Sequence, residues 1–225
     1  MNTLFKKYPA FAISLTLHTT LAGLLCFVPL FNLLAFEFCF AIGCLTALTG
    51  PLIGYGQIYK QDKPPSAAVL SSVFIQALTH TLPALFVILL NALRIPNCNV
   101  TQGLMFFACL PIVSSVYGAA LGLLIGLWTH HIKRIFRGIL FCLLFIAPLL
   151  SILWHLYTQP TIFIFDHLWG YFPGSLYDEG RRVNETLLLF RSFTCLRIII
   201  LGLAIYFSLK CYTKKMKNII ALIGL

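Results

Sequence analysis

The chain has 225 residues, of which 60% are hydrophobic and 10% are charged, with a mean hydropathy of +0.92 and a formal net charge of +10. An average soluble domain is about 45–50% apolar and about 25% charged, so a water-soluble protein of this length could not bury so much apolar surface. The composition therefore excludes a soluble enzyme, a disordered chain and a secreted disulfide-stabilised module, and indicates an integral membrane protein.

Six apolar stretches are long enough to cross a membrane as helices. A hydrocarbon core about 30 Å thick requires about 20 apolar residues of helix, and in lipid a helix satisfies its own backbone groups. None of the stretches alternates with the period of two that a barrel strand shows. We therefore predict an all-α, polytopic membrane helical bundle, a single integral membrane domain over residues 1–225. Its spans are predicted at about 9–31, 34–56, 67–91, 103–128, 138–157 and 193–212.

The first two spans are separated by little more than a turn. Residues 29–32 are the only turn-like residues between them, which predicts a tight helical hairpin. No small-residue cleavage site follows the first stretch, so we expect a retained helix rather than a signal peptide. In the third span, Pro83 removes a backbone hydrogen bond and predicts a kink close to His80.

The Lys and Arg residues predict the orientation of the spans. With the N-terminus inside, eleven of the sixteen fall in inner segments and five in outer segments. Because cytoplasmic loops are enriched in Lys and Arg, we expect both termini in the cytoplasm. The basic residues are scattered over short segments, so the expected partner is the lipid bilayer and not a nucleic acid.

The eight cysteines show no CxxC pair and no spacing typical of metal ligands, and seven lie within or beside apolar spans. We therefore expect neither a metal site nor a cofactor.

Gly118, Gly122 and Gly126 form a GxxxGxxxG pattern in the fourth span, and Gly50 and Gly54 repeat the spacing in the second. Small residues at this spacing predict close helix packing, either within one chain, which we favour, or between two copies.

The longest segment between spans is the outer loop 158–192. Its aromatic residues are expected at the head-group level of the outer surface, because Trp and Tyr prefer that depth. Asn184 is expected to cap a helix that continues into the sixth span. The loop also contains the candidate catalytic residues His167, Asp178 and Glu179, which with Asp166 could bind a cation or supply a general acid and base. The alternative is a solvated turn whose acids pair with neighbouring arginines. The aromatic residues concerned are Trp169, Tyr171, Phe172 and Tyr177.

The string GYFPGSLYDE (Gly170–Glu179), with its aromatic-rich lead-in and LLLFR continuation, resembles a stretch in uncharacterised bacterial multi-pass membrane proteins. Two further pieces are similar to the same group: Phe36-Glu37-Phe38, and Asn97-Cys98-Asn99 followed by GLMFF at residues 103–107. The resemblance implies a bacterial inner (cytoplasmic) membrane. In some similar proteins a peptidase-like domain follows the membrane region; we expect this chain to lack it, so the resemblance implies no catalytic residue here.

Several polar residues lie inside the predicted spans. Glu37 is the only acidic one, and a charge in hydrocarbon needs a partner, for which Arg94 and Arg197 are the candidates at the same level. Glu37 could instead be a protonatable carboxylate on a transport path. His18 and His80 could line a polar cavity, or each could bond to a neighbouring helix.

Three functions remain open from the sequence. A scaffold or subunit of a membrane complex, bound to another membrane or periplasmic protein, is favoured because the sequence contains no recognisable catalytic motif. A small transporter or channel is the second, using Glu37, His18 and His80. A membrane enzyme acting through the outer loop is the third; it is the least expected, because no metalloprotease, serine-hydrolase or phosphate-loop pattern occurs.

Overall fold

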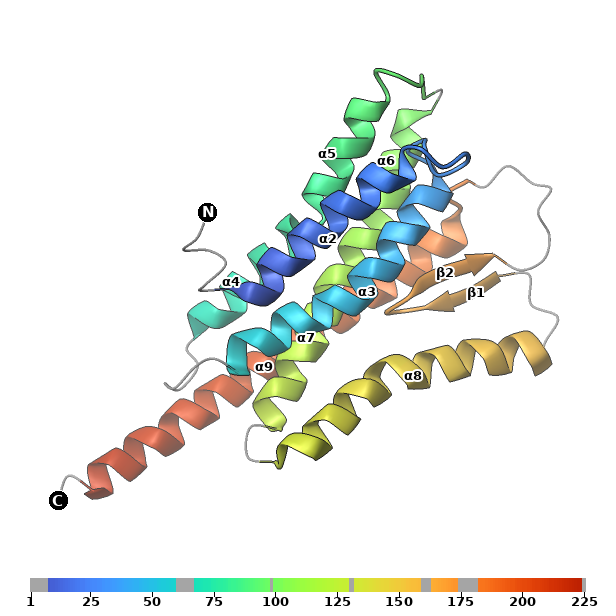
Figure 1. The fold of residues 1–225 in the computed structure, drawn as a ribbon. Helices are drawn as coiled ribbons and strands as arrows, with labels where there is room; N and C mark the ends of the chain where they lie inside the picture. Colours follow the sequence, from blue (N-terminus) through green and yellow to red (C-terminus); the bar gives the residue numbers. More distant parts are fainter. Residues whose placement is uncertain are drawn as a thin grey trace.

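A computed structural model describes residues 8–59, 67–97, 99–129, 132–158, 163–173 and 182–223. It contains a bundle of helices and one short β-hairpin (Figure 1). In chain order the elements are α2 (Pro9–Leu25), α3 (Phe36–Tyr59), α4 (Ala67–Thr79), α5 (Leu82–Asn91), α6 (Val100–Phe107), the π-helical turn η1 (Ala108–Ile112), α7 (Val113–Trp128), α8 (Arg134–Thr158), β1 (Phe163–Asp166), β2 (Gly170–Pro173) and α9 (Glu185–Ile223).

The predicted all-α membrane bundle is confirmed. Within the described residues, five helical segments are long and apolar enough to cross a membrane. The first predicted span is shorter than expected, because α2 ends at Leu25 and residues 26–35 form turns. With 17 residues, α2 lies at the lower limit of helices that cross a bilayer. The five spanning segments are Phe36–Ile58, Ala68–Asn91, Val100–Trp128, Ile135–Thr158 and Glu185–Lys210.

Side-chain caps decide where two of the helices begin. The Asn99 carboxamide oxygen accepts a hydrogen bond from the Gln102 backbone N–H at 3.2 Å, so α6 starts before the predicted residue 103. Asn184 accepts from the Leu187 backbone N–H at 2.9 Å, which confirms the predicted cap of the last helix. The last helix therefore starts eight residues before the predicted span boundary at 193.

The closest pair of helices is α3 and α7, which lie side by side and run in the same direction (Figure 1). A Cβ atom on Gly54 would overlap the Ala119 carbonyl oxygen, and one on Gly122 would overlap the Pro51 carbonyl oxygen. Gly118 and Gly126 also face α3, against Pro51 and Ile58. The GxxxGxxxG glycines are therefore used in a contact within one chain.

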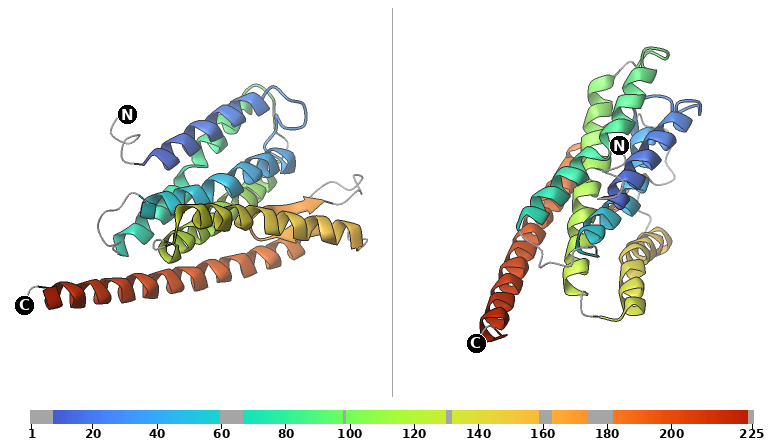
Figure 2. Two further views of the ribbon diagram at one scale, coloured as in Figure 1. Left: turned by 60° about the horizontal axis from the view of Figure 1, so that its bottom comes forward. Right: turned by 60° about the vertical axis from the view of Figure 1, so that its left-hand side comes forward.

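The other helices surround this central pair unevenly. The helix α2 packs on α3 and α5, while α4 and α9 pack on α7. By contrast, α8 touches the rest of the protein at few points and lies apart from the bundle in Figure 1 and in the right-hand view of Figure 2. Most of its side chains are exposed, as expected for a helix that faces lipid.

The hairpin β1–β2 enters the bundle. Its strands pair antiparallel, with Asp166 opposite Gly170 at the turn. The side chains of Leu168 and Trp169 pack in one apolar cluster with Ala47, which lies in the middle of α3. The prediction that this aromatic segment lies on the outer surface is wrong for Trp169 and Tyr171, which are 9% and 7% exposed. Backbone outside helices is tolerated at this depth because protein surrounds it.

Candidate functional site in the middle of the bundle

Four polar side chains from different helices meet in the bundle interior. They are His18 of α2, Thr49 of α3, His80 between α4 and α5, and Ser115 of α7, which we call the midplane cluster. Each lies within about two residues of the middle of its spanning segment or helix. His18, His80 and Ser115 are fully buried and Thr49 is 5% exposed. The cluster therefore occupies the middle of the hydrophobic thickness.

The geometry of His18 assigns its tautomer. Its Nδ1 lies 2.7 Å from the Ser14 carbonyl oxygen one turn earlier. A carbonyl can only accept, so Nδ1 carries the ring proton and donates. In the neutral ring, Nε2 is then an unprotonated acceptor, and it is buried without a hydrogen-bond partner within the described residues.

His80 has the same arrangement. Its Nδ1 lies 3.1 Å from the Gln76 carbonyl oxygen and 3.4 Å from the Ser115 hydroxyl, which itself donates to the Ala77 carbonyl at 2.6 Å. Nδ1 is therefore protonated and Nε2 is an acceptor. The His80 Nε2 faces the Thr49 hydroxyl at 3.5 Å, a long contact, because that hydroxyl already donates to the Leu45 carbonyl at 2.9 Å.

The two imidazole rings contact each other edge to face. Their centroids are 4.8 Å apart and their planes are at 89°. In each ring, Nδ1–H donates to a backbone carbonyl and Nε2 is an unprotonated acceptor in the bundle interior. Because the rings are in contact, two positive charges there would repel each other.

Breaks in two helices create this site. The third span is interrupted at His80–Thr81, where α4 stops and α5 begins with Pro83 in its first turn, as the sequence predicted for this proline. The fourth span contains the π-helical turn η1 around Pro111, four residues before Ser115. Broken membrane helices and π-helical turns are both enriched at functional sites, because they free backbone groups and redirect side chains.

Buried polar side chains lie beside the cluster toward the end of α3 and the start of α4. The Gln57 amide donates to the Gln76 side-chain oxygen at 3.0 Å, and the Gln76 amide donates to the Ser72 hydroxyl at 3.0 Å. These three residues, which we call the glutamine path, lie toward the end of α3 and the start of α4. A buried apolar cluster that includes Phe38, Phe107 and Leu110 lies toward the opposite end.

A second polar arrangement holds the β-hairpin. Arg191 of α9 is 3% exposed, and its guanidinium donates to the His167 carbonyl at 3.2 Å and to the Ser114 hydroxyl at 3.1 Å. The His167 ring is stacked on Phe190, with centroids 4.4 Å apart, and its Nδ1 lies 2.8 Å from the Thr194 hydroxyl. Arg191 thus fixes the hairpin turn to both α7 and α9.

Asp166 and Gly170 shape the hairpin turn so that it can contact Arg191. One Asp166 carboxylate oxygen accepts from the backbone N–H groups of Leu168 and Trp169, at 2.8 and 2.7 Å. Gly170 has φ of +101°, and a Cβ there would lie 2.8 Å from an Arg191 nitrogen. Asp166 and His167 therefore shape and anchor the turn.

Acid conditions are expected to weaken the hairpin contact. Burial, followed by the positive charge of Arg197, lowers the pKa of His167 below its usual value near 6.5; Asp166 opposes the shift and Arg191 adds to it. When the hairpin is detached from the bundle, the His167 ring binds a proton below about pH 6.5. When the hairpin is packed in the bundle, the lowered pKa keeps the ring neutral to a lower pH. The packed hairpin therefore becomes less stable as the pH falls below about 6.5. Trp169 quenching by a soluble quencher should rise over this range. In His167→Phe, which keeps an aromatic ring on Phe190, that pH dependence should be absent; an unchanged profile would contradict this role.

The remaining predicted residues lie elsewhere. Glu37 is in the first turn of α3, where the helix N-terminus stabilises a negative charge. Arg94 donates to the Cys26 carbonyl at 3.3 Å and lies over the Phe27 ring, and Arg197 is exposed on α9. Asp178 and Glu179 lie outside the described residues. The structure thus brings His18 and His80 together and places Glu37 at the end of its helix.

The sequence did not single out Ser114, Ser115 and Thr49. Serine and threonine are common in membrane helices, and only the side chains that these three contact in the folded protein mark them as part of a site. Arg191 was expected only as a partner for loop acids, whereas it holds the hairpin. Among the described residues, no group of three or more His, Cys, Asp or Glu side chains is placed to hold a metal ion. The imidazole and hydroxyl groups of the midplane cluster can form hydrogen bonds and transfer protons.

No protein-family model matches the chain, and no curated protein or solved structure is significantly similar to it.

Proposed function

We propose that the protein is a small proton-translocating membrane transporter, with His18 and His80 as the groups that take up and release the proton. The observation that carries the proposal is the contact of two buried imidazoles in the middle of the bundle, each with an unprotonated Nε2. Imidazole is the side chain whose ordinary pKa lies closest to neutral pH, and intramembrane histidines are typical of proton relays.

The surroundings of the site support the same proposal. The glutamine path gives a proton hydrogen-bonding groups between His80 and one end of the bundle. A buried apolar cluster that includes Phe38, Phe107 and Leu110 lies toward the opposite end. The break at His80–Thr81 is a hinge about which α4 can move relative to α5.

We also propose that the protein lies in the inner membrane of a bacterium with both termini in the cytoplasm, because this orientation places most Lys and Arg residues inside. The glutamine path then opens toward the cytoplasm.

Proton flux into liposomes tests the proposal. The purified protein is reconstituted with a trapped pH-sensitive dye, and a potassium diffusion potential drives protons inward. We expect the wild type to acidify the liposomes, and His80→Gln to reduce the rate at least about tenfold, because an amide cannot take up a proton near neutral pH. His155→Gln is the matched control, since His155 is exposed on α8.

Particle size and helical content must match between the variants, so that a lost flux is not a lost fold. Wild-type flux no faster than that of empty liposomes would overturn the proposal. So would full flux in both His18→Gln and His80→Gln.

A second candidate function, the membrane-complex subunit, is favoured by α8. Most of its described side chains are exposed, including Trp154 and Tyr157, and it contacts the bundle at few points. A partner helix would bind there and not at Trp169 or Tyr171, which are buried. A stoichiometric partner that cross-links to position 154 in native membranes would establish this role.

A further inference from the structure

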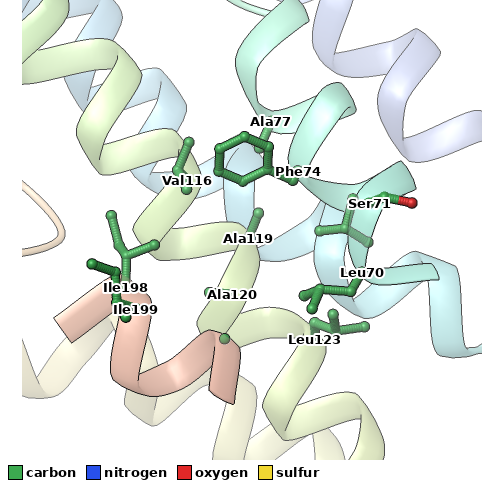
Figure 3. A pocket seen from close by; sticks show the side chains of 12 residues that line it. Leu70, Ser71, Phe74, Ala77, Val116, Ala119, Ala120, Leu123, Ile198 and Ile199 are labelled. Atoms are coloured by element: carbon green, nitrogen blue, oxygen red, sulfur yellow. The ribbon is translucent and has the colours of Figure 1, made fainter. Parts of the chain in front are cut away.

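A groove of about 430 Å³ lies on the membrane-facing side of the bundle, between α4, α7 and α9 (Figure 3). Its walls are apolar, and small residues leave the space unfilled: Ala77 of α4, Ala119 and Ala120 of α7, and Gly202 of α9. A Cβ on Gly202 would meet no atom within 4 Å. None of the four side chains of the midplane cluster lines the groove.

The groove is short along the helix axis. Along α7 the lining runs from Val116 to Leu123, about 11 Å of helix. Only about two turns of a partner helix would lie along a groove of this length. The volume lies within the roughly 300–1,000 Å³ of small-molecule sites, and the lining suits a flexible hydrocarbon chain.

The positive charge toward the C-terminal end of α9 indicates which kind of lipid head group would bind beside the groove. Lys210 lies eight residues after Gly202 on α9, about 12 Å along the helix axis, and is exposed. Lys214, Lys215 and Lys217 follow on the same helix, and no acidic residue occurs from Ile198 to Leu225. Half of the hydrocarbon thickness is about 15 Å, so a chain lying in the groove would place its head group near the level of Lys210, at the basic end of α9.

We infer that the groove binds one acyl chain of an anionic phospholipid whose head group lies at the basic end of α9. The acyl chain fills the gap between α9 and α4, and the lysines favour a negative phosphate over a zwitterionic head group. The bound lipid would thereby fix α9 against the bundle.

Native mass spectrometry of the purified protein in a mild detergent tests this inference, with phosphatidylglycerol and phosphatidylcholine as probes. We expect the wild type to retain one phosphatidylglycerol at least about tenfold more tightly than phosphatidylcholine. Gly202→Leu fills the groove and should weaken phosphatidylglycerol binding at least about tenfold. Gly138→Leu is the matched control, since a Cβ on Gly138 of α8 also meets no atom within 4 Å.

Two further variants keep the test decisive. Replacing Lys214, Lys215 and Lys217 by Gln should reduce phosphatidylglycerol binding to the level of phosphatidylcholine. If Gly202→Leu lowers helical content, Ser71→Leu narrows the groove from the α4 side instead. Equal binding of the two lipids by the wild type would overturn the inference. Unchanged binding in a folded groove-filling variant, or a photoreactive residue at position 74 that captures a polypeptide instead of a lipid, would also overturn it.

Discussion

Gly122→Ala is expected to prevent stable folding, with a loss of about 3 kcal/mol or more in the free energy of unfolding. The added Cβ would overlap the Pro51 carbonyl oxygen, which belongs to the backbone of α3 and cannot turn aside. The helices would have to separate along their whole contact, because Gly54 and Gly118 hold the same two backbones together. Overpacking a tight core typically costs about 1–3 kcal/mol, and a clash with backbone lies at the upper end.

The melting temperature in detergent and the amount of protein in the membrane both measure this effect. Gly138→Ala and Gly202→Ala are matched controls, because a Cβ at either position meets no atom within 4 Å. Both should accumulate and melt like the wild type. A Gly122→Ala protein with wild-type abundance and melting temperature would show that α3 and α7 do not pack as described.

Arg191→Met is expected to release the β-hairpin from the bundle. The substitution keeps an unbranched side chain but removes two donors, so the His167 carbonyl and the Ser114 hydroxyl lose their partner in a low-dielectric interior. Each unsatisfied buried group costs about 1–3 kcal/mol, so for the two groups we expect a local loss of about 2–6 kcal/mol. Arg191→Lys should recover little of the lost stability of the hairpin contact, because an ammonium group does not present two donors in the fixed geometry of a guanidinium.

Trp169 reports this release. The chain contains three tryptophans, and Trp128 and Trp154 can be replaced by Phe, since both are 66% exposed. In that background, iodide quenching of Trp169 should be weak in the wild type and several-fold stronger in Arg191→Met. Equal quenching in the two proteins would contradict the role of Arg191 as the anchor of the hairpin.

Local sequence signals predicted much of the fold. Long apolar stretches, the proline of the broken third span and the cap at Asn184 each act over a few residues, and the structure has all three. The hairpin was missed because its stability comes from Arg191 and the surrounding helices, which are distant in sequence from β1. In an isolated outer loop, the same aromatic residues would indeed favour the membrane surface.

The site could be predicted only in part. His18 and His80 stood out as ionisable residues in apolar spans, yet 62 positions separate them and the order of helices in a bundle is not encoded in local pattern. Thr49 and Ser115 carried no signal of their own, because hydroxyl residues are common in membrane helices. Glu37 was a stronger candidate by charge, but its place in the first turn of α3 gives it a local explanation.

Thiol labelling at position 80 tests most directly whether the midplane cluster is a transport site rather than a sealed core. His80→Cys is placed in a background without other cysteines and exposed to a small, membrane-impermeant thiol reagent from each side of the membrane. The account predicts labelling from the side of Gln57 and Ser72, where the glutamine path leads. Absence of labelling from either side, in a protein that remains folded, would contradict it.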